Sequence, residues 1–104
     1  MLNELEDKVI QWSMDRGILQ NGTKQGQALK LVSEVGELCD NVAKGRNPVD
    51  DIGDCTVVLI NLAAMHGYKL EECLLHAYND IKDRRGYLNE DGVFIKESDI
   101  EHDI

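Results

Sequence analysis

Apolar residues recur every three or four positions over most of the chain, which is the spacing of amphipathic helices. A first run begins at Leu2 and continues through Leu5, Val9 and Trp12 to a stop at Gly17, and we read it as a helix. The following segment, residues 18–27, carries two glycines and is predicted to be a loop.

The middle of the chain predicts two longer helices and a short connection. The first covers about residues 24–44, with Thr23 as its N-cap and Gly45 at its end. The second covers about residues 48–66 and is apolar nearly all round, so we expect it to be buried on most sides. A tight turn between them makes the two helices antiparallel neighbours.

The C-terminal third predicts one more helix and a hairpin. The helix begins near residue 70 and runs through the stretch YNDIKDRRG, with an inward face of Leu70, Leu74, Ala77, Tyr78 and Ile81. Two β-prone runs about an Asp-Gly turn form a hairpin over residues 87–96, and residues 97–104 are an acidic tail. We therefore expect an all-α bundle of four to five helices with a small C-terminal β-hairpin, as a single domain over residues 1–104 with its core helices at about 24–86.

Charge and composition narrow the classes of partner. The chain has 104 residues and a formal charge of −9, so it lacks the basic surface that binds polymeric DNA or RNA. The sequence shows neither a leader-like start nor an apolar run long enough to span a membrane. We therefore expect a cytoplasmic protein with no membrane partner. The three cysteines, Cys39, Cys55 and Cys73, have no paired spacing and are expected to be reduced and mostly buried.

Four acids stand in the two central helices. Glu34 and Glu37 are three residues apart, as are Asp51 and Asp54, so each pair shares a helix face. Each pair belongs to a longer stripe at helical spacing, with Gln27, Lys30 and Asn41 on the first helix and Val58 and Asn61 on the second. Antiparallel packing would bring all four carboxylates together.

Such a cluster needs a counter-charge. Two unit charges about 6 Å apart at an effective dielectric of about 20 repel by roughly 3 kcal/mol, and Lys30 alone cannot neutralise four acids. A lone ExxE pair on a helix is usually only a solvated face, but Asp54 lies within an apolar helix, where carboxylates are rare unless paired or on a metal. The four acids together favour a site for a hard divalent cation such as Mg²⁺.

These helices resemble the MazG-like all-α nucleoside triphosphate pyrophosphohydrolases. The acidic blocks of that family stand here as SEVGE, thirteen intervening residues, and DIGD, and the resemblance covers about residues 24–86. Two positions depart from the family pattern, since Ser33 and Asp51 stand where Glu is usual. Asp51 keeps the charge with a shorter reach, whereas Ser33 loses one.

The resemblance implies hydrolysis of a (d)NTP to the (d)NMP and pyrophosphate, in nucleotide-pool housekeeping. Glu34, Glu37, Asp51 and Asp54 would bind Mg²⁺, with Mn²⁺ as a substitute, and Glu34 or Glu37 would take the proton of the attacking water. This is chemically coherent, because divalent cations neutralise a triphosphate and lower the pKa of a water aimed at the α-phosphorus.

Several residues are candidates for substrate contact. Lys82 and Arg85, together with Asn79, stand where the resemblance puts a substrate-side helix, although basic residues at a helix end also simply complement its dipole. Trp12 can stack on a base, but its place in the first apolar stripe favours core or interface packing. The polar stripes add Gln27, Lys30 and Asn61, and solvated positions account equally well for Gln27 and Lys30.

The apolar character of residues 48–66 calls for more cover than one short chain provides, and with the resemblance it implies a homodimer or homotetramer. A second hypothesis from another class is a catalytically silent helical module that docks a partner on its acidic surface, and Ser33 keeps that hypothesis open. A di-iron bundle is disfavoured, because those sites use Glu-x-x-His motifs and the sequence has none.

Overall fold

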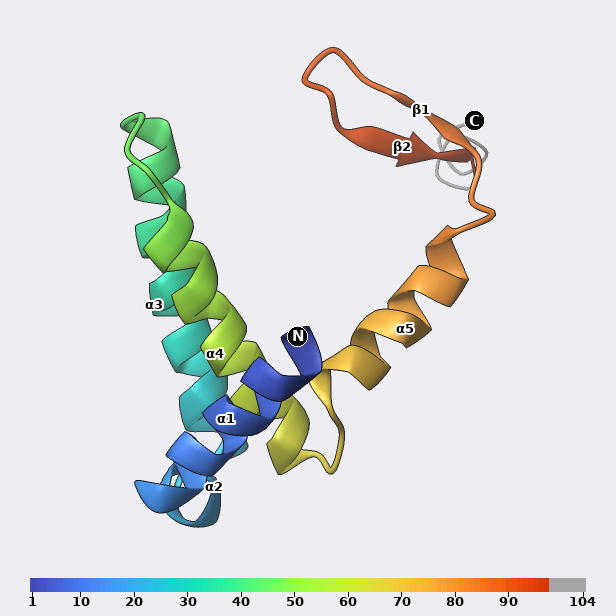
Figure 1. Ribbon diagram of the computed structural model, residues 1–104. Coiled ribbons are helices and arrows are strands. Elements are labelled where there is room, and N and C mark those ends of the chain that lie inside the picture. The colour runs from blue at the N-terminus through green and yellow to red at the C-terminus, as the bar shows by residue number, and fades with distance from the viewer. Residues whose placement is uncertain (98–104) are drawn as a thin grey trace. The chain divides into compact units, whose positions relative to one another are not determined.

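The computed structural model describes residues 1–97, so residues 98–104 of the predicted acidic tail lie outside the described part (Figure 1). Its elements in chain order are α1 (Leu2–Asp15), α2 (Ile18–Asn21), α3 (Lys24–Ala43), α4 (Val49–Met65), α5 (Leu70–Ile81), β1 (Gly86–Leu88) and β2 (Phe94–Lys96). The all-α architecture with a small C-terminal hairpin is confirmed. The chain divides into two compact units, Met1–Cys73 and Leu74–Ile104, and the single domain stays a prediction.

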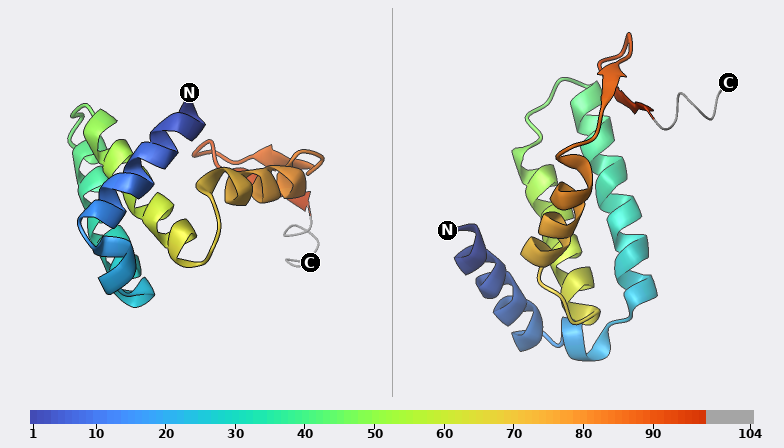
Figure 2. Two further views of the ribbon diagram at one scale, coloured as in Figure 1. Left: turned by 60° about the horizontal axis from the view of Figure 1, so that its bottom comes forward. Right: turned by 90° about the vertical axis from the view of Figure 1, so that its right-hand side faces the viewer.

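The hairpin of α3 and α4 is the centre of the first unit, and the two helices lie side by side and antiparallel (Figure 2). Thr23 caps α3 as expected, because its Oγ1 accepts a hydrogen bond from the backbone N–H of Gly26 at 2.9 Å. Gly45 follows the helix with φ 69°, a conformation that favours glycine. Asn47 Oδ1 accepts from the backbone N–H of Val49 at 3.0 Å, so α4 begins one residue later than predicted.

The buried apolar side chains of the described chain all belong to α4: Cys55, Val58, Ile60 and Ala63. Val58 is the most enclosed of them, with 1% of its surface exposed. The other side of the same helix leaves Val49, Ile52 and Leu59 exposed. The prediction that the helix over about residues 48–66 is buried on most sides is therefore confirmed for one face of α4 and wrong for its other side within a single chain.

The buried face of α1 differs from the predicted one. Leu2, Leu5 and Trp12 are exposed, whereas Glu6 and Ser13 are buried. Consecutive residues of a helix point about 100° apart, and Glu6 and Ser13 directly follow Leu5 and Trp12. The face of α1 that packs is therefore the one next to its most apolar stripe. The polar groups of Glu6 and Ser13 are satisfied by hydrogen bonds, which is why they tolerate burial.

The expected loop over residues 18–27 was wrong in part, because it contains α2 and the first turn of α3. Gly17 enters α2 with φ 75°, and the backbone N–H of Gly22 closes the turn on the carbonyl of Ile18 at 2.8 Å. Ile18 is only partly exposed, and α2 contacts both α1 and α4. Tertiary packing thus stabilises a single turn that local propensity does not predict.

The start of α5 is tied to α1 by side chains. The carboxylate of Glu6 accepts from the backbone N–H of Leu70 at 2.5 Å and of Glu71 at 3.4 Å, so a residue far away in the sequence caps this helix. Lys69 pairs with Asp7, and that side-chain hydrogen bond raises the pKa of the Lys69 ammonium group. These contacts lie within the first unit, Met1–Cys73.

The rest of α5 differs from the prediction in length and burial. The helix ends at Ile81, so Lys82 lies in the turn that follows it and Arg85 lies further along, immediately before β1. The expected inward face was wrong for Leu74, Ala77, Tyr78 and Ile81, which are all exposed. No residue of α5 is buried in the described part of the chain.

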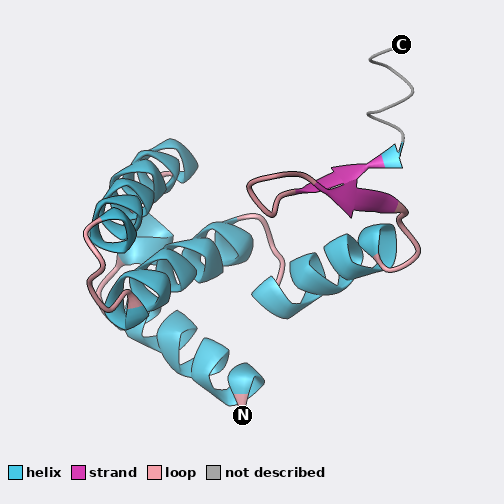
Figure 3. Ribbon diagram, turned by 90° about the horizontal axis from the view of Figure 1, so that it is seen from above, coloured by secondary structure: helices cyan, strands magenta, loops and turns pink. Residues whose placement is uncertain are grey.

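The C-terminal hairpin is confirmed and belongs to the second unit (Figure 3). β1 and β2 pair antiparallel with Tyr87 opposite Ile95. Gly92 turns with φ 77°, and Asn89 Oδ1 accepts from the backbone N–H groups of Asp91 and Val93 at 3.0 Å and 2.9 Å. The Asp-Gly signal therefore predicted the turn correctly.

Two further expectations can be compared with the structure. Of the cysteines, Cys55 is buried but Cys39 and Cys73 are exposed, so the expectation of mostly buried thiols was wrong for these two. None of the helices within residues 1–97 is long and apolar enough to cross a membrane.

Candidate functional site

The polar stripes of α3 and α4 meet along the line where the two helices pack. We call this line the polar seam, and its residues are Gln27, Lys30, Glu34, Glu37 and Asn41 on α3 with Asp51, Asp54 and Asn61 on α4. At its loop end, Asn41 Nδ2 donates to Asp51 Oδ2 at 2.9 Å. This bond fixes the antiparallel register and leaves Asp51 with 9% of its surface exposed.

The acids of the two helices share one electrostatic field. Burial raises the pKa of the Asp54 carboxyl, and the negative charges of Asp50, Glu34 and Asp51 raise it further. Lys30 acts in the opposite direction, and its Nζ lies 3.4 Å from Glu34 Oε1. Carboxylates from facing helices are therefore close enough to repel one another, with one lysine among them.

The same field reaches the core behind the seam. Burial raises the pKa of the Cys55 thiol first, and the charges of Glu34, Asp51 and Asp54 add to the effect. Cys55 is the residue that follows Asp54 on α4, and its side chain belongs to the buried core. The acids thus lie at the boundary between the apolar centre of the hairpin and the solvent.

The acids are engaged separately in this structure. Glu34 pairs with Lys30 and Asp51 accepts from Asn41, while Glu37 is exposed and has no hydrogen bond or ion pair among the described residues. Over residues 1–97, no three His, Cys, Asp or Glu side chains lie together as a ready metal site. The chemistry of the donors still suits a hard divalent cation, because all four offer carboxylate oxygens and their charge is not balanced.

At the opposite end of the seam, Asn61 joins three helices. Its Nδ2 donates to Gln27 Oε1 on α3 at 3.5 Å, and its Oδ1 accepts from Ser13 Oγ on α1 at 2.6 Å. Asn61 is 3% exposed, so the side chain predicted to contact substrate is bonded within the protein. Sequence reasoning missed Ser13, although a 3, 4 spacing links it to Val9 and Glu6 on one face of α1.

Four other candidates for substrate contact are exposed, namely Trp12, Asn79, Lys82 and Arg85, whereas Gln27 is partly buried against Asn61. Trp12 is 44% exposed, and the guanidinium carbon of Arg16 lies 4.5 Å from the centroid of its ring, which is a cation–π contact. Arg16 thus covers one face of the Trp12 ring. The prediction that Trp12 packs into the core is wrong for the single chain. Asn79, Lys82 and Arg85 belong to the second unit, and their approach to the seam stays a prediction.

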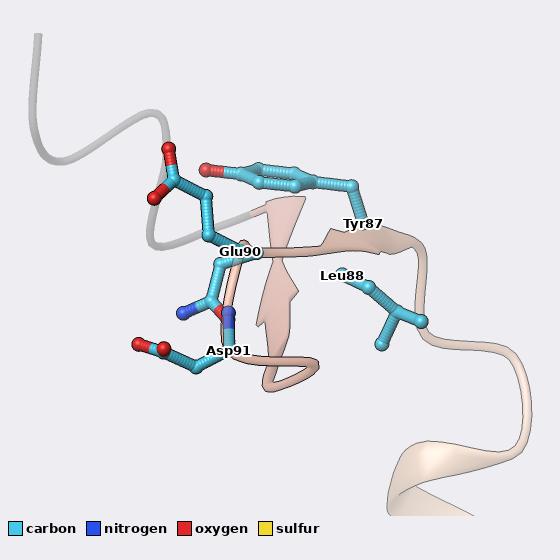
Figure 4. A pocket seen from close by; sticks show the side chains of 5 residues that line it. Tyr87, Leu88, Glu90 and Asp91 are labelled. Atoms are coloured by element: carbon cyan, nitrogen blue, oxygen red, sulfur yellow. The ribbon is translucent and has the colours of Figure 1, made fainter.

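A surface hollow lies on the C-terminal hairpin, lined by Tyr87, Leu88, Asn89, Glu90 and Asp91 (Figure 4). It contains none of the residues predicted from the sequence to form a site. The side-chain oxygen of Asn89 is already used by two backbone N–H groups of the turn. The hollow therefore follows from the shape of the turn and does not compete with the polar seam as a candidate.

The chain was compared with known protein families, curated proteins and solved structures. No family model matches the chain. An uncharacterized 18.2 kDa protein of the rep-hol intergenic region of Haemophilus phage HP1 (strain HP1c1) is 45% identical over 64 residues. That match covers 60% of this chain and 39% of the relative, so it spans only about two fifths of the length of that protein.

A solved structure matches over nearly the whole chain. It is the MazG-like pyrophosphohydrolase of cyanophage S-2L bound to dGDP and three catalytic Mn²⁺ ions per active site. The TM-score is 0.68 at 21% sequence identity, and the match covers 92% of this chain and 96% of that one. The chain therefore has the all-α fold of a MazG-like pyrophosphohydrolase, which confirms at the level of the fold the resemblance indicated by its acidic blocks.

Proposed function

We propose that the protein hydrolyses a nucleoside triphosphate to the monophosphate and pyrophosphate with the help of divalent cations. The observation that carries this proposal is the polar seam, where carboxylates of α3 and α4 repel one another around a single lysine. Excess negative charge of this kind favours cation binding. The fold supports it, since the cyanophage protein of the same fold is bound to dGDP and three catalytic Mn²⁺ ions.

Glu34, Glu37, Asp51 and Asp54 are the residues that would hold Mg²⁺ or Mn²⁺. When bound, such cations neutralise the triphosphate charge and lower the pKa of the attacking water. Asn41 supports the set by donating to Asp51. Lys30 already neutralises part of the charge of Glu34, and a bound cation would free it to pair with a phosphate oxygen.

Glu37 is the better candidate for the base that takes the proton of the attacking water. It is exposed and has no hydrogen bond or ion pair among residues 1–97, whereas Glu34 is paired with Lys30. A general base needs a free lone pair within reach of the proton. Asn79, Lys82 and Arg85 are proposed to contact the triphosphate, with Lys82 and Arg85 opposing its charge.

A homo-oligomer is part of the proposal. Exposed apolar side chains cover much of α5 and the outer side of α4, including Leu74, Tyr78, Ile81 and Ile52. Large exposed apolar surface of this kind is typical of protein–protein interfaces. We expect a homodimer or homotetramer by analytical ultracentrifugation at micromolar concentration, and a monomer at that concentration would contradict this part.

A panel of canonical and modified (d)NTPs with Mg²⁺ or Mn²⁺, assayed separately for monophosphate and pyrophosphate, tests the reaction and its preferred base. Asp54→Asn should remove most of the activity, because it removes a negative ligand. Asp40→Asn is the matched control, since Asp40 is also on the hairpin but is exposed and pairs with Lys44 at 2.7 Å. Absence of products from every nucleotide, together with no binding of either cation, would instead favour a silent interaction module.

A further inference from the structure

The polar seam is closed at both ends by side-chain amides. At the loop end, Asn41 Nδ2 donates to Asp51 Oδ2 at 2.9 Å, and at the other end Asn61 Nδ2 donates to Gln27 Oε1 at 3.5 Å. Both bonds join α3 to α4, and the acids Glu34, Glu37 and Asp54 lie between them along the helices. We call these two bonds the amide clasps.

Each clasp is oriented by a third residue. Ser13 Oγ donates to Asn61 Oδ1 at 2.6 Å, and Arg46 Nη1 donates to Asn41 Oδ1 at 3.4 Å. An amide whose oxygen accepts on one side presents its NH₂ group on the other, so both asparagines are turned toward the facing helix. The two ends of the seam thus repeat one arrangement with different partners.

At the Asn61 end of the seam, the bond from Ser13 to Asn61 is buried. Ser13 is 0% exposed and Asn61 is 3% exposed, so water cannot replace the hydroxyl if it is removed. A buried amide that loses its partner either stays unsatisfied or turns toward another partner. Ser13 also brings α1 into this end of the seam, because its hydroxyl bonds Asn61 on α4, which in turn bonds Gln27 on α3.

A force must oppose the repulsion between the acids before a cation binds. Glu34 and Glu37 on α3 and Asp51 and Asp54 on α4 carry like charges, and repulsion between the two pairs acts to separate the helices. The clasps lie on both sides of the repelling groups and resist such a separation. Because of these positions, the clasps can hold the carboxylates in place before a cation binds. A stabilising bond elsewhere in the protein would not do this.

We propose that Ser13, Asn41 and Asn61 are positioning residues, which keep α3 and α4 in the register that lets their acids share a divalent cation. The inference rests on the proposed function. It assigns Asn61 to the support of the seam in place of a direct contact with substrate. It also adds Ser13 on α1, which no sequence motif had indicated.

The test compares three variants of the full-length protein by calorimetric titration with Mn²⁺ and by thermal melting. Asn41→Ala should weaken Mn²⁺ binding about 10- to 100-fold, as loss of a group bonded to a metal ligand does. Ser13→Ala, which acts through Asn61, should weaken it about 3- to 30-fold. Thr56→Val is the control, because it removes a hydroxyl on α4 that donates to the carbonyl of Ile52 at 2.8 Å and not to the seam.

All three variants can lose thermal stability, but only the two seam variants should lose Mn²⁺ affinity in the folded state. If the wild-type protein binds Mn²⁺ and both seam variants bind it equally well, the clasps are merely structural and the inference is overturned, while the proposed function stands. If the wild-type protein does not bind Mn²⁺, the proposed function is overturned and the inference with it. Should Ser13→Ala fail to fold, Asn41→Ala decides, since Asn41 is partly exposed near the loop.

Discussion

Replacing Asp54 by Asn should have opposite effects on stability with and without a divalent cation. Burial and the charges of Asp50, Glu34 and Asp51 raise the pKa of Asp54, so its charged form is disfavoured in the folded protein. Asparagine removes that charge while keeping nearly the same shape. Without metal, the variant should therefore melt at a higher temperature than the wild-type protein at neutral pH.

The pH dependence of this gain has a definite sign. A carboxyl group whose folded pKa is raised destabilises the protein once it ionises, and it has no such effect where it is protonated in both states. The advantage of Asp54→Asn should be smallest below the ordinary pKa of 3.8 and should grow as the pH rises through the raised value. A gain that is the same at acidic and neutral pH would show that the charge is not its cause.

With metal the order should reverse. A ligand at 100 times its Kd stabilises a folded protein by about 2.7 kcal/mol, which is on the order of 10–20 °C in Tm for a domain of roughly 100 residues. The wild-type protein should gain this increment in saturating Mn²⁺, and Asp54→Asn should lose most of it. Its melting curves should thus lie above those of the wild-type protein without metal and below them with metal.

Differential scanning calorimetry with EDTA and with a titration of MnCl₂ measures both effects in one series. Asp40→Asn is the matched control, because Asp40 is exposed and paired with Lys44, so it should keep the full metal increment. A variant that is less stable than the wild-type protein under both conditions would show that Asp54 is simply a structural residue. Equal metal increments in the wild-type protein and Asp54→Asn would refute the assignment of Asp54 as a ligand.

Three further changes test the packing described above. Val58→Ala should lower the free energy of unfolding by roughly 2 kcal/mol in urea titrations followed by circular dichroism, because Val58 is 1% exposed and two buried methyl groups are lost; a change near zero would mean that the centre of α4 is not packed. Glu6→Ala should lower the free energy of unfolding by about 1–3 kcal/mol in the same assay, since the N–H of Leu70 loses its acceptor. An unchanged midpoint would contradict the role of Glu6 as the cap of α5. A thiol reagent at pH 8 should modify two cysteines quickly and Cys55 slowly, because Cys55 is buried with a raised pKa, whereas three equal rates would contradict its place in the core.

The central hairpin could be predicted because its signals are local. Thr23 accepts from a backbone N–H three residues later, and Gly45 adopts a positive φ at the end of α3. The Asp-Gly turn of the C-terminal hairpin is equally local. Caps and turns of this kind depend on a few neighbouring residues, so the sequence alone carries them.

The parts that were missed depend on contacts between distant residues. Periodicity indicated Leu5 and Trp12 as the buried face of α1, but the face that packs includes Ser13, whose partner Asn61 is 48 residues away. The single turn of α2 is stabilised by contacts with α1 and α4. The exposed length of α5 could not be predicted either, because an amphipathic helix has the same pattern whether its cover comes from its own chain or from another.

The candidate site lies between these cases. Spacing along α3 and α4 predicted that their acids would share one seam, and the bond from Asn41 to Asp51 joins the two stripes at one end. Over residues 1–97 no three His, Cys, Asp or Glu side chains lie together, so a shared site of four carboxylates stays a prediction. The partners that orient the amides, Ser13 and Arg46, follow from the tertiary packing. Their hydroxyl and guanidinium groups have no motif by which they could have been recognised.

Hydrolysis of a (d)NTP in water labelled with ¹⁸O tests the central claim most directly. Attack on the α-phosphorus would place one labelled oxygen in the monophosphate and leave the pyrophosphate unlabelled, as mass spectrometry of the two products would show. We predict this pattern with Mn²⁺ or Mg²⁺, and loss of most of the turnover in Asp54→Asn. Label in inorganic phosphate with a diphosphate as the second product, or no turnover of any nucleotide, would contradict the account.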